Sequence, residues 1–355
     1  MRENKSAIVA MSGGVDSSVA AALAVELGYV CEGVMLKLHR DFSGEDVSCG
    51  APADTEHARV VADTLGIPFS LLTCEDSFDK NVIERFVASY ESGVTPNPCI
   101  ECNRYMKFGH LFDYADEHGV DCIITGHYAR TEYDEKYGRV VLKKAVDESK
   151  DQSYVLYSLP ADKLARIILP LGSYKKSEVR EKASALGFSN AEKKESQDIC
   201  FIPDGDYVSF LERYRQKTFE GGSFVNASGD VLGSHKGIIR YTIGQHKKLG
   251  LVTPEPMYVS EIRPENNEIL LVTEPELFKN EVKIENLVWS AFDTPQKEFR
   301  ASAKLRYRHK AAPCTVKICG SGATLIFDEG QRAPARGQSA VIYDGDTVLG
   351  GGVIA

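Results

Sequence analysis

The feature that most constrains this chain is a serine- and glycine-rich turn that joins a short apolar run to a helical run near its start. Residues 6–11, Ser-Ala-Ile-Val-Ala-Met, predict a buried strand, and the Ala- and Leu-rich stretch from Asp16 to Gly28 predicts a helix that ends in glycine. Between them lies Ser12-Gly-Gly-Val-Asp-Ser-Ser18. Its two glycines leave backbone N–H groups unobstructed and the helix N-terminus adds a partial positive charge, so this loop is suited to bind pyrophosphate.

The loop differs from the P-loop of ATPases that cleave at the γ-phosphate, because it lacks the G-x-x-x-x-G-K-[ST] pattern. It resembles the pyrophosphate loop of ATP pyrophosphatases, which activate a carbonyl oxygen by adenylylation and release pyrophosphate. A serine N-cap followed by a glycine turn is the alternative interpretation. The complete strand–loop–helix pattern favours the phosphate site.

Strands and helices continue to alternate along the first half of the chain. Apolar runs predict strands at 30–36, 67–73 and 121–125. Helical patterns occur at 54–65, 78–90, 105–118 and 175–186. This alternation predicts an α/β fold with a Rossmann-like parallel sheet, in which ligands bind beyond the carboxyl ends of the strands. Residues 129–146 depart from it and predict a β-hairpin around Lys136-Tyr-Gly138.

The pattern changes after about residue 218, where short apolar runs are separated by Gly, Pro, Asn and Asp. These runs predict strands at 257–262, 268–272, 282–288, 301–306, 314–319, 323–327 and 339–343. We therefore expect a small C-terminal β-barrel that follows a linking domain. The expected domain boundaries are 1–205 for the pyrophosphate-loop domain, 206–275 for a small central domain and 276–355 for the barrel.

Composition limits the cellular compartment in which this 355-residue chain is expected. The longest apolar run, 19–25, is far shorter than the roughly 18 residues that span a bilayer, so no membrane partner is expected. The N-terminal residues offer no secretory signal. Nine cysteines, an odd number, indicate thiol chemistry in a reducing compartment rather than a disulfide framework, and we expect a cytoplasmic protein.

The net charge of −9 argues at first against a nucleic-acid partner. It is uneven, because residues 1–200 hold 23 basic and 32 acidic side chains whereas residues 201–355 hold 19 of each. Two stretches, 231–250 and 299–317, have no acidic residue and carry tyrosines that could stack on unpaired bases. Their basic residues are Lys236, Arg240, Lys247, Lys248, Arg300, Lys304, Arg306, Arg308, Lys310 and Lys317. A single charged run is more often a solvated face, but two such runs favour RNA.

Two cysteines stand at C-x-x-C spacing in Thr95-Pro-Asn-Pro-Cys-Ile-Glu-Cys-Asn103. We expect a helix to begin at Asn103, just after Cys102, where its N-terminus would lower the pKa of the thiol and favour the reactive thiolate. A structural zinc half-site, a redox pair and buried core cysteines are the alternatives. Zinc would need four ligands from Cys or His.

A third cysteine, Cys200, follows the charged run at 192–195, whose Lys193 and Lys194 could support a thiolate. An isolated cysteine before Phe-Ile-Pro is more often a core residue than a catalytic one. The stretch by itself leaves both possibilities open.

Taken in order, these motifs make the chain resemble the tRNA-specific 2-thiouridylases, which are tRNA-uridine 2-sulfurtransferases of the ATP pyrophosphatase superfamily. The likeness extends over essentially the whole chain. The matching motifs are SGGVDSS (12–18), TPNPCIECN (95–103) with KFG (107–109), TGHYAR (125–130), KDQSYVLY (150–157), DICF (198–201), YTIGQHKKLGL (241–251), LRYRHK (305–310), GQSAV (337–341) and GGGVI (350–354).

The resemblance implies a reaction. ATP, with Mg²⁺, would adenylylate the C2 oxygen of the wobble uridine of tRNA. A persulfide on Cys200 would deliver sulfur, and Cys102 would act as nucleophile on it and end in a disulfide with Cys200. The products would be 2-thiouridine, AMP and pyrophosphate, and a cysteine desulfurase or a sulfur-relay protein would supply the sulfur.

The resemblance also implies which residues make the contacts. The residues that match the ATP site are Ala10, Met11, Ser12, Gly13, Gly14, Val15, Asp16, Ser17, Met35 and Gly126. Those that match the target-base segment are Asn97, Pro98 and Cys99. Those that match tRNA contacts are His127, Lys150, Asp151, Gln152, Arg306, Tyr307 and Gln338.

One position departs from the family pattern. Many members carry Asp where Cys99 stands, proposed as a general acid/base, and a thiol with an ordinary pKa near about 8.5 is a different proton-transfer group. Cys99 therefore opens an alternative in which Cys99, Cys102 and Cys200 bind three irons of a [4Fe–4S] cluster and the fourth iron carries sulfur. In that case Cys102 and Cys200 would be ligands rather than nucleophile and persulfide carrier.

Other classes of protein share part of this pattern. Argininosuccinate synthetase, a small-molecule adenylylating ligase, also has an SGGxDSS loop but requires neither paired cysteines nor a basic β-domain. Amidotransferase relatives often carry Cys at position 2, where this chain has Arg2. A non-enzymatic RNA-binding or sulfur-carrier protein would be expected to have a degenerate loop, whereas Ser12, Gly14, Asp16 and Ser17 are intact.

Overall fold

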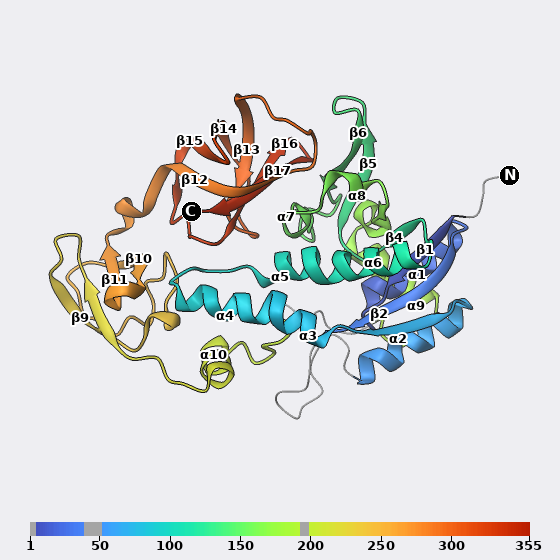
Figure 1. Ribbon diagram of the computed structural model, residues 1–355, viewed down its shortest axis with the longest axis horizontal. Helices are drawn as coiled ribbons and strands as arrows, with labels where there is room; N and C mark the ends of the chain where they lie inside the picture. The colour runs from blue at the N-terminus through green and yellow to red at the C-terminus, as the bar shows by residue number, and fades with distance from the viewer. Residues whose placement is uncertain (1–4, 39–51, 192–198) are drawn as a thin grey trace.

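A computed structural model describes residues 5–38, 52–191 and 199–355 of the chain (Figure 1). Lys193 and Lys194, expected to support a thiolate, lie outside the described residues. In the part that is described, no helix is long and apolar enough to cross a membrane. The expected α/β class, with a Rossmann-like parallel sheet, a small central domain and a C-terminal β-barrel, is confirmed.

The N-terminal domain is built on a parallel sheet with the strand order β3-β2-β1-β4-β7. The strands are β1 (Ser6–Ala10), β2 (Val30–Lys37), β3 (Phe69–Thr73), β4 (Cys122–Ile124) and β7 (Ile167–Ile168). Alternate residues of β1 face opposite sides, so Ala7 and Val9 pack with α1 whereas Ile8 joins the cluster on the other face. From β1 the chain first adds β2 and β3 on one side of the sheet and later adds β4 and β7 on the other side. The strand order therefore reverses between β1 and β4, and the crevice there is where a ligand is expected.

Helices cover both faces of this sheet. One face carries α1 (Val15–Glu26), α2 (Pro52–Leu65) and α9 (Lys176–Ala185). The other carries two long helices, each interrupted by a π-helical segment. The first comprises α3 (Glu75–Phe78), η1 (Asp79–Ile83) and α4 (Glu84–Glu91), and the second comprises α5 (Pro98–Glu101), η2 (Cys102–His110) and α6 (Leu111–Glu117).

The expected helix start at Asn103 is wrong. The helix begins at Pro98, because proline suits the first helical position and the Asn97 side chain caps the helix by accepting a hydrogen bond from the Cys99 N–H at 3.2 Å. Cys99 therefore lies in the first helical turn and Cys102 in the second. The favourable field of the helix N-terminus acts on Cys99 rather than on Cys102.

The C-terminal barrel consists of antiparallel strands in the order β12-β15-β14-β13-β16-β17 and is closed by pairing of β12 with β17. Its strands are β12 (Phe278–Trp289), β13 (Glu298–Lys304), β14 (Ala312–Cys319), β15 (Gly322–Arg332), β16 (Ser339–Asp344) and β17 (Thr347–Ile354). The predicted hairpin forms from β5 (Ala129–Asp134) and β6 (Arg139–Lys144), and β6 pairs with β17. A hairpin of the first domain thus extends the barrel sheet.

The central domain contains α10 (Tyr207–Arg215) and a sheet of β8 (Gly222–Val225), β9 (Val231–His235), β10 (Tyr258–Arg263) and β11 (Glu268–Val272). Arg215 of α10 bonds to Glu84 and Glu91, which joins this domain to α4. Figure 1 shows the central domain at the far end of α4 and the barrel over α5, beside the short helix α7 (Ser153–Leu156). Sequence patterns did not predict α10, β8, β9 or β17.

Candidate functional site

A pocket of about 210 Å³ lies at the carboxyl ends of β1, β2 and β4. It brings together seven of the residues predicted to bind ATP, namely Ala10, Met11, Ser12, Asp16, Ser17, Met35 and Gly126. Gly13, Gly14 and Val15 form the turn beside them. These residues come from the ends of β1, β2 and β4 and from the start of α1, and the parallel sheet places them around one crevice.

Hydroxyl groups and glycines fix the shape of the loop. The Ser17 hydroxyl donates to the Gly14 carbonyl at 3.0 Å and accepts the Ser12 N–H at 3.1 Å. Asn190 donates to the Gly13 carbonyl at 3.0 Å. Gly13 has φ +71°, and a Cβ there would lie 2.3 Å from the Asp54 carbonyl oxygen, so only glycine permits this turn. The loop is thereby held open at the N-terminus of α1, where backbone N–H groups attract anions.

The carboxylate of Asp16 is held by two partners from distant parts of the chain. Lys176, only 8% exposed, places its Nζ 2.7 and 2.8 Å from the two carboxylate oxygens. The Tyr128 hydroxyl donates to Asp16 Oδ1 at 2.8 Å. This arrangement neutralises the carboxylate and fixes its orientation, which makes the loop less repulsive to a phosphate chain.

The opposite wall of the pocket is formed by residues 125–127, which come directly after β4. A Cβ at Gly126 would lie 2.8 Å from the Asp16 carbonyl carbon and the Ser17 nitrogen, so the wall approaches α1 as closely as glycine allows. Next to it, the buried His127 shares a hydrogen bond of 2.8 Å with the Thr125 hydroxyl. Burial and the nearby Lys107 ammonium hold the pKa of His127 well below its ordinary value, so the ring is neutral at pH 7. His127 was predicted to contact tRNA, and it lies on the wall of this pocket.

A second cavity of about 830 Å³ opens beside the first, and Asp16 and Gln152 line both. It lies between the 148–152 segment and the basic barrel stretch after β13. Its other lining residues are Tyr128, Lys144, Glu148, Ser149, Lys150, Asp151, Lys304, Tyr307, Arg308, His309, Lys310 and Ala311. The predicted RNA-contact residues 150–152 and Tyr307 therefore gather at this cavity. Tyr307 is 38% exposed, and its ring centroid lies 5.9 Å from that of Tyr154.

The predicted RNA-contact residues also have partners within the protein, as Asp151, Arg306 and Gln338 illustrate. Asp151 is buried and accepts hydrogen bonds from the Ala145 and Ser153 N–H groups. The Arg306 guanidinium donates to the carbonyls of Ile243 and Ala333 and so joins the central domain to the barrel. Gln338 bonds to the loop that precedes Pro98.

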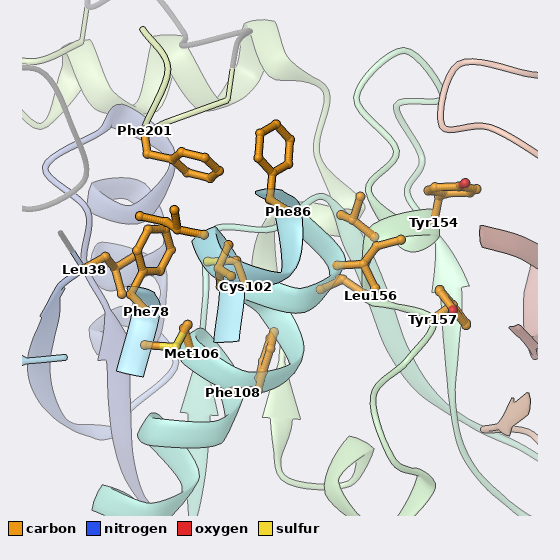
Figure 2. Packing of buried hydrophobic residues seen from close by; sticks show 14 of the residues in the cluster. Leu38, Phe78, Phe86, Cys102, Met106, Phe108, Tyr154, Leu156, Tyr157 and Phe201 are labelled. Carbon is orange, nitrogen blue, oxygen red and sulfur yellow. The ribbon is translucent and has the colours of Figure 1, made fainter. Parts of the chain in front are cut away.

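Cys102 and Cys200 approach the same apolar cluster. Cys102 is 7% exposed and belongs to the cluster, and Cys200 packs against it from the 199–203 segment. Phe201 anchors that segment, with its ring centroid 5.8 Å from that of Phe78 and 5.4 Å from that of Phe86. Figure 2 shows Cys102 within the group formed by these rings. The two thiols, which lie on separate segments of the chain, therefore belong to or border one apolar cluster.

The third cysteine differs from these two. Cys99 is exposed at the start of α5, one turn away from the buried Cys102. Across the described ranges, no three Cys, His, Asp or Glu side chains converge as ligands of a metal ion. In the described structure, Cys99, Cys102 and Cys200 are thus not gathered as one set of ligands.

Sequence patterns missed several residues that shape the site. Lys176 and Tyr128 hold Asp16, Asn190 holds the turn, and Lys107 lines the pocket. Lys107 and Tyr128 stand inside motifs that were noticed, so their position in a motif was a usable signal. Lys176 and Asn190 stand in stretches with no special spacing, and only the packing of α9 on α1 brings them to the loop.

Three family models together match almost the whole chain. They are described as a tRNA methyl transferase HUP domain (residues 5–204), a tRNA methyl transferase PRC-barrel domain (208–273) and an aminomethyltransferase beta-barrel domain (279–354).

Curated relatives match over their full length. The chain is 44% identical over 354 residues to a tRNA-specific 2-thiouridylase of Clostridioides difficile (strain 630), covering 99% of this chain and 98% of the relative. It is 45% identical over 355 residues to a tRNA-specific 2-thiouridylase of Carboxydothermus hydrogenoformans, covering 99% and 97%. A crystal structure of a 4-thiouridine synthetase with RNA and ATP aligns at 20% identity and a TM-score of only 0.36 over 59% of this chain and 50% of that one.

Proposed function

This chain belongs to the family of tRNA-specific 2-thiouridylases, and on that basis we propose that it converts the wobble uridine of tRNA into 2-thiouridine with ATP and a cysteine persulfide. One observation carries the proposal for the site. The pocket at the pyrophosphate loop and the basic cavity share Asp16 and Gln152, so a nucleotide in the first can meet an RNA base that enters through the second.

Activation of the uridine uses the pocket. The C2 oxygen of the base attacks the α-phosphorus of ATP, the bond from that phosphorus to the bridging oxygen breaks, and pyrophosphate leaves. The N-terminus of α1 and the N–H groups of the 13–17 loop stabilise the charge that develops on pyrophosphate. Lys176 keeps Asp16 from repelling it. Mg²⁺ bound with ATP would neutralise further phosphate charge, and Asp16 is the carboxylate of this pocket that could meet it.

Sulfur transfer uses the two thiols that pack against one cluster. The Cys102 thiolate attacks Sγ of the Cys200 persulfide, which forms the Cys102–Cys200 disulfide and releases hydrosulfide. Hydrosulfide attacks C2 of the adenylylated uridine and AMP leaves, so the transferred sulfur is reduced while the two cysteines are oxidised. A dithiol reductant then restores the thiols, and a persulfide donor such as a cysteine desulfurase or a sulfur-relay protein reloads Cys200.

Cysteine variants test this chemistry. We expect Cys102→Ser and Cys200→Ser each to abolish 2-thiouridine formation, because serine can neither attack nor carry sulfane sulfur. Nucleoside mass spectrometry of the reacted tRNA measures the product, and pyrophosphate release in a single turnover shows whether activation survives. Cys319→Ser is the matched control, because Cys319 is an exposed thiol at the end of β14.

The outcomes separate the alternatives. Appreciable thiolation by either Cys102→Ser or Cys200→Ser would refute the persulfide route. Retained activity in Cys99→Asp would favour that route, because many relatives carry Asp there. Iron and sulfide in stoichiometric amounts after anaerobic purification, with activity lost on their removal, would establish the cluster instead. Pyrophosphate release with citrulline and aspartate, but not with tRNA, would point to a small-molecule ligase.

A further inference from the structure

The segment that carries Cys99 and Cys102 is attached to the C-terminal barrel at both of its ends. Before the cysteines, the Thr95 N–H donates to the Arg336 carbonyl at 2.9 Å. Gln338 Nε2 donates to the carbonyls of Thr95 and Pro96 at 3.0 and 3.2 Å. Gln338 and Thr95 lie 243 positions apart in the sequence. Three hydrogen bonds thus fix the backbone just before the helix that begins at Pro98.

The other end of the segment is held through α7. The buried Asn103 side chain, next to Cys102, donates to the Val155 carbonyl at 3.0 Å. The neighbouring Tyr154 hydroxyl donates to the Ser339 carbonyl at 2.8 Å, and the hydroxyls of Tyr157 and Ser339 lie 3.1 Å apart. Residues 336–339 of the barrel therefore hold both flanks of the cysteine segment.

The barrel stretch is itself rigid enough for this purpose. The Gly337 N–H donates to the Ile354 carbonyl at 3.0 Å, and the Ile354 N–H donates to the Gln338 carbonyl at 2.8 Å. Gly337 has φ +84°, and a Cβ there would lie 2.1 Å from Val94 Cγ1. The close approach needs glycine, because any side chain would push the Val94–Pro96 loop away.

We infer that the barrel stretch 336–339 positions the cysteine segment for sulfur transfer, in addition to any contact of Gln338 with tRNA. The inference rests on the proposed function. Reacting atoms must be held within a fraction of an ångström, and a displacement of about 1 Å can cost on the order of 100-fold in rate. The barrel is thus a support for the chemistry as well as a surface for RNA.

Two variants of the full-length protein test this. Gly337→Ala introduces the clash with Val94, and Gln338→Ala removes two hydrogen bonds without a clash. We expect each variant to thiolate tRNA with a turnover rate, measured at saturating tRNA, lowered by about 10-fold or more, while the KM for ATP stays within about 2-fold of the parent. In Gly337→Ala, which keeps the Gln338 side chain, the Kd for tRNA should also stay within about 2-fold. Adding Val94→Ala to Gly337→Ala removes the clashing methyl group and should restore part of the loss.

Gly320→Ala is the matched control. Gly320 lies in the β14–β15 turn of the same barrel with φ +62° and no atom within 4 Å of its would-be Cβ, so the change brings similar backbone strain without touching the cysteine segment. It should keep the turnover rate of the parent. If Gly337→Ala fails to fold, the turnover rate of Gln338→Ala alone tests the inference.

Three results would overturn the inference. One is a turnover rate in both variants equal to that of Gly320→Ala. Another is a rise in the Kd for tRNA large enough to explain the loss, which would make Gln338 an RNA contact only. The third is no recovery on adding Val94→Ala. Failure of the parent protein to thiolate tRNA at all would instead contradict the proposed function.

Discussion

At the scale of single residues, burial makes three of the cysteine thiols unreactive. Burial raises the pKa of Cys31 and Cys122 to about 11 and that of Cys314 to about 12, so these thiols stay protonated at neutral pH. Thiolate is the form that attacks a persulfide, so these positions are structural. Cys99 and Cys200, by contrast, are at least partly exposed.

His127 gives a residue-scale prediction on pH. Its folded pKa is held well below 6.5 by burial and by Lys107, whereas the unfolded chain takes up a proton near pH 6.5. The unfolded state therefore binds more protons below that pH, and the free energy of unfolding should fall by up to about 1.4 kcal/mol per pH unit as the pH decreases from 6.5 toward the folded pKa. Urea denaturation between about pH 5 and pH 7 measures this slope.

Removing the titrating ring checks the cause. His127→Gln keeps a hydrogen-bonding side chain and should flatten the slope. His118→Gln is the control, because His118 is exposed at the end of α6. An unchanged slope in His127→Gln would show that another group produces the pH dependence.

At the scale of elements, close approaches of backbone segments decide where functional groups point. The start of α1 meets the loop after β4 at Gly126, and the start of α5 is set by Pro98 and the Asn97 cap. Both are junctions between a loop and the first turn of a helix, where backbone N–H groups remain available to a ligand or a thiol. A shift of either junction would move the reacting groups without unfolding the domain.

Gly126→Ala tests the first junction. The added Cβ would stand 2.8 Å from backbone atoms of Asp16 and Ser17, which cannot move without distorting the pyrophosphate loop. We expect ATP affinity, measured by isothermal titration, to fall by about 10-fold or more. Gly119→Ala is the control for backbone strain away from the loop, because Gly119 has φ +64° but its would-be Cβ has no atom within 4 Å. Equal affinities for the two variants would show that the junction tolerates a side chain.

At the scale of the whole molecule, packing decides which cations of the two basic stretches form ion pairs with acidic residues of other elements. Arg300 lies in the acid-free stretch 299–317, yet it forms an ion pair of 2.6 Å with Asp328 of β15. Arg240 likewise pairs with Glu212 of α10 at 2.8 Å. Arg308 and Lys310, in contrast, line the cavity next to the pyrophosphate loop; Lys304 also lines it but pairs with Asp151 at 3.7 Å. Positive charge reaches the site from the barrel, although the N-terminal half of the chain is acidic.

This distribution predicts which cations bind RNA. Removing both Arg308 and Lys310 by substitution with Ala should weaken tRNA binding and reduce the slope of log K against log salt by about 1 to 2, because each phosphate contact contributes about 0.7 to 0.9. Filter binding over a range of salt concentrations measures the slope. Arg300→Ala, from the same stretch, should leave it unchanged, and a reduction there equal to that of the double variant would contradict the assignment.

The sequence by itself determined the local parts of this protein. Alternating apolar and helical runs, the SGGVDSS loop and the ordered motifs predict the strands and helices of the parallel sheet, the strands of the barrel and the pyrophosphate loop, because these depend on residues close together in the chain. Patterns missed the helix start at Pro98, which depends on the Asn97 cap, and the short elements α10, β8 and β9.

Only the tertiary structure decided which distant residues meet. Lys176 holds Asp16 from 160 positions away, and Gln338 holds Thr95 from 243. Phe201 anchors the Cys200 segment against Phe86, in the same apolar cluster that contains Cys102. Such contacts follow from the packing of whole elements, which no local spacing encodes, and they determine where the carboxylate, the thiols and the cations of the site stand.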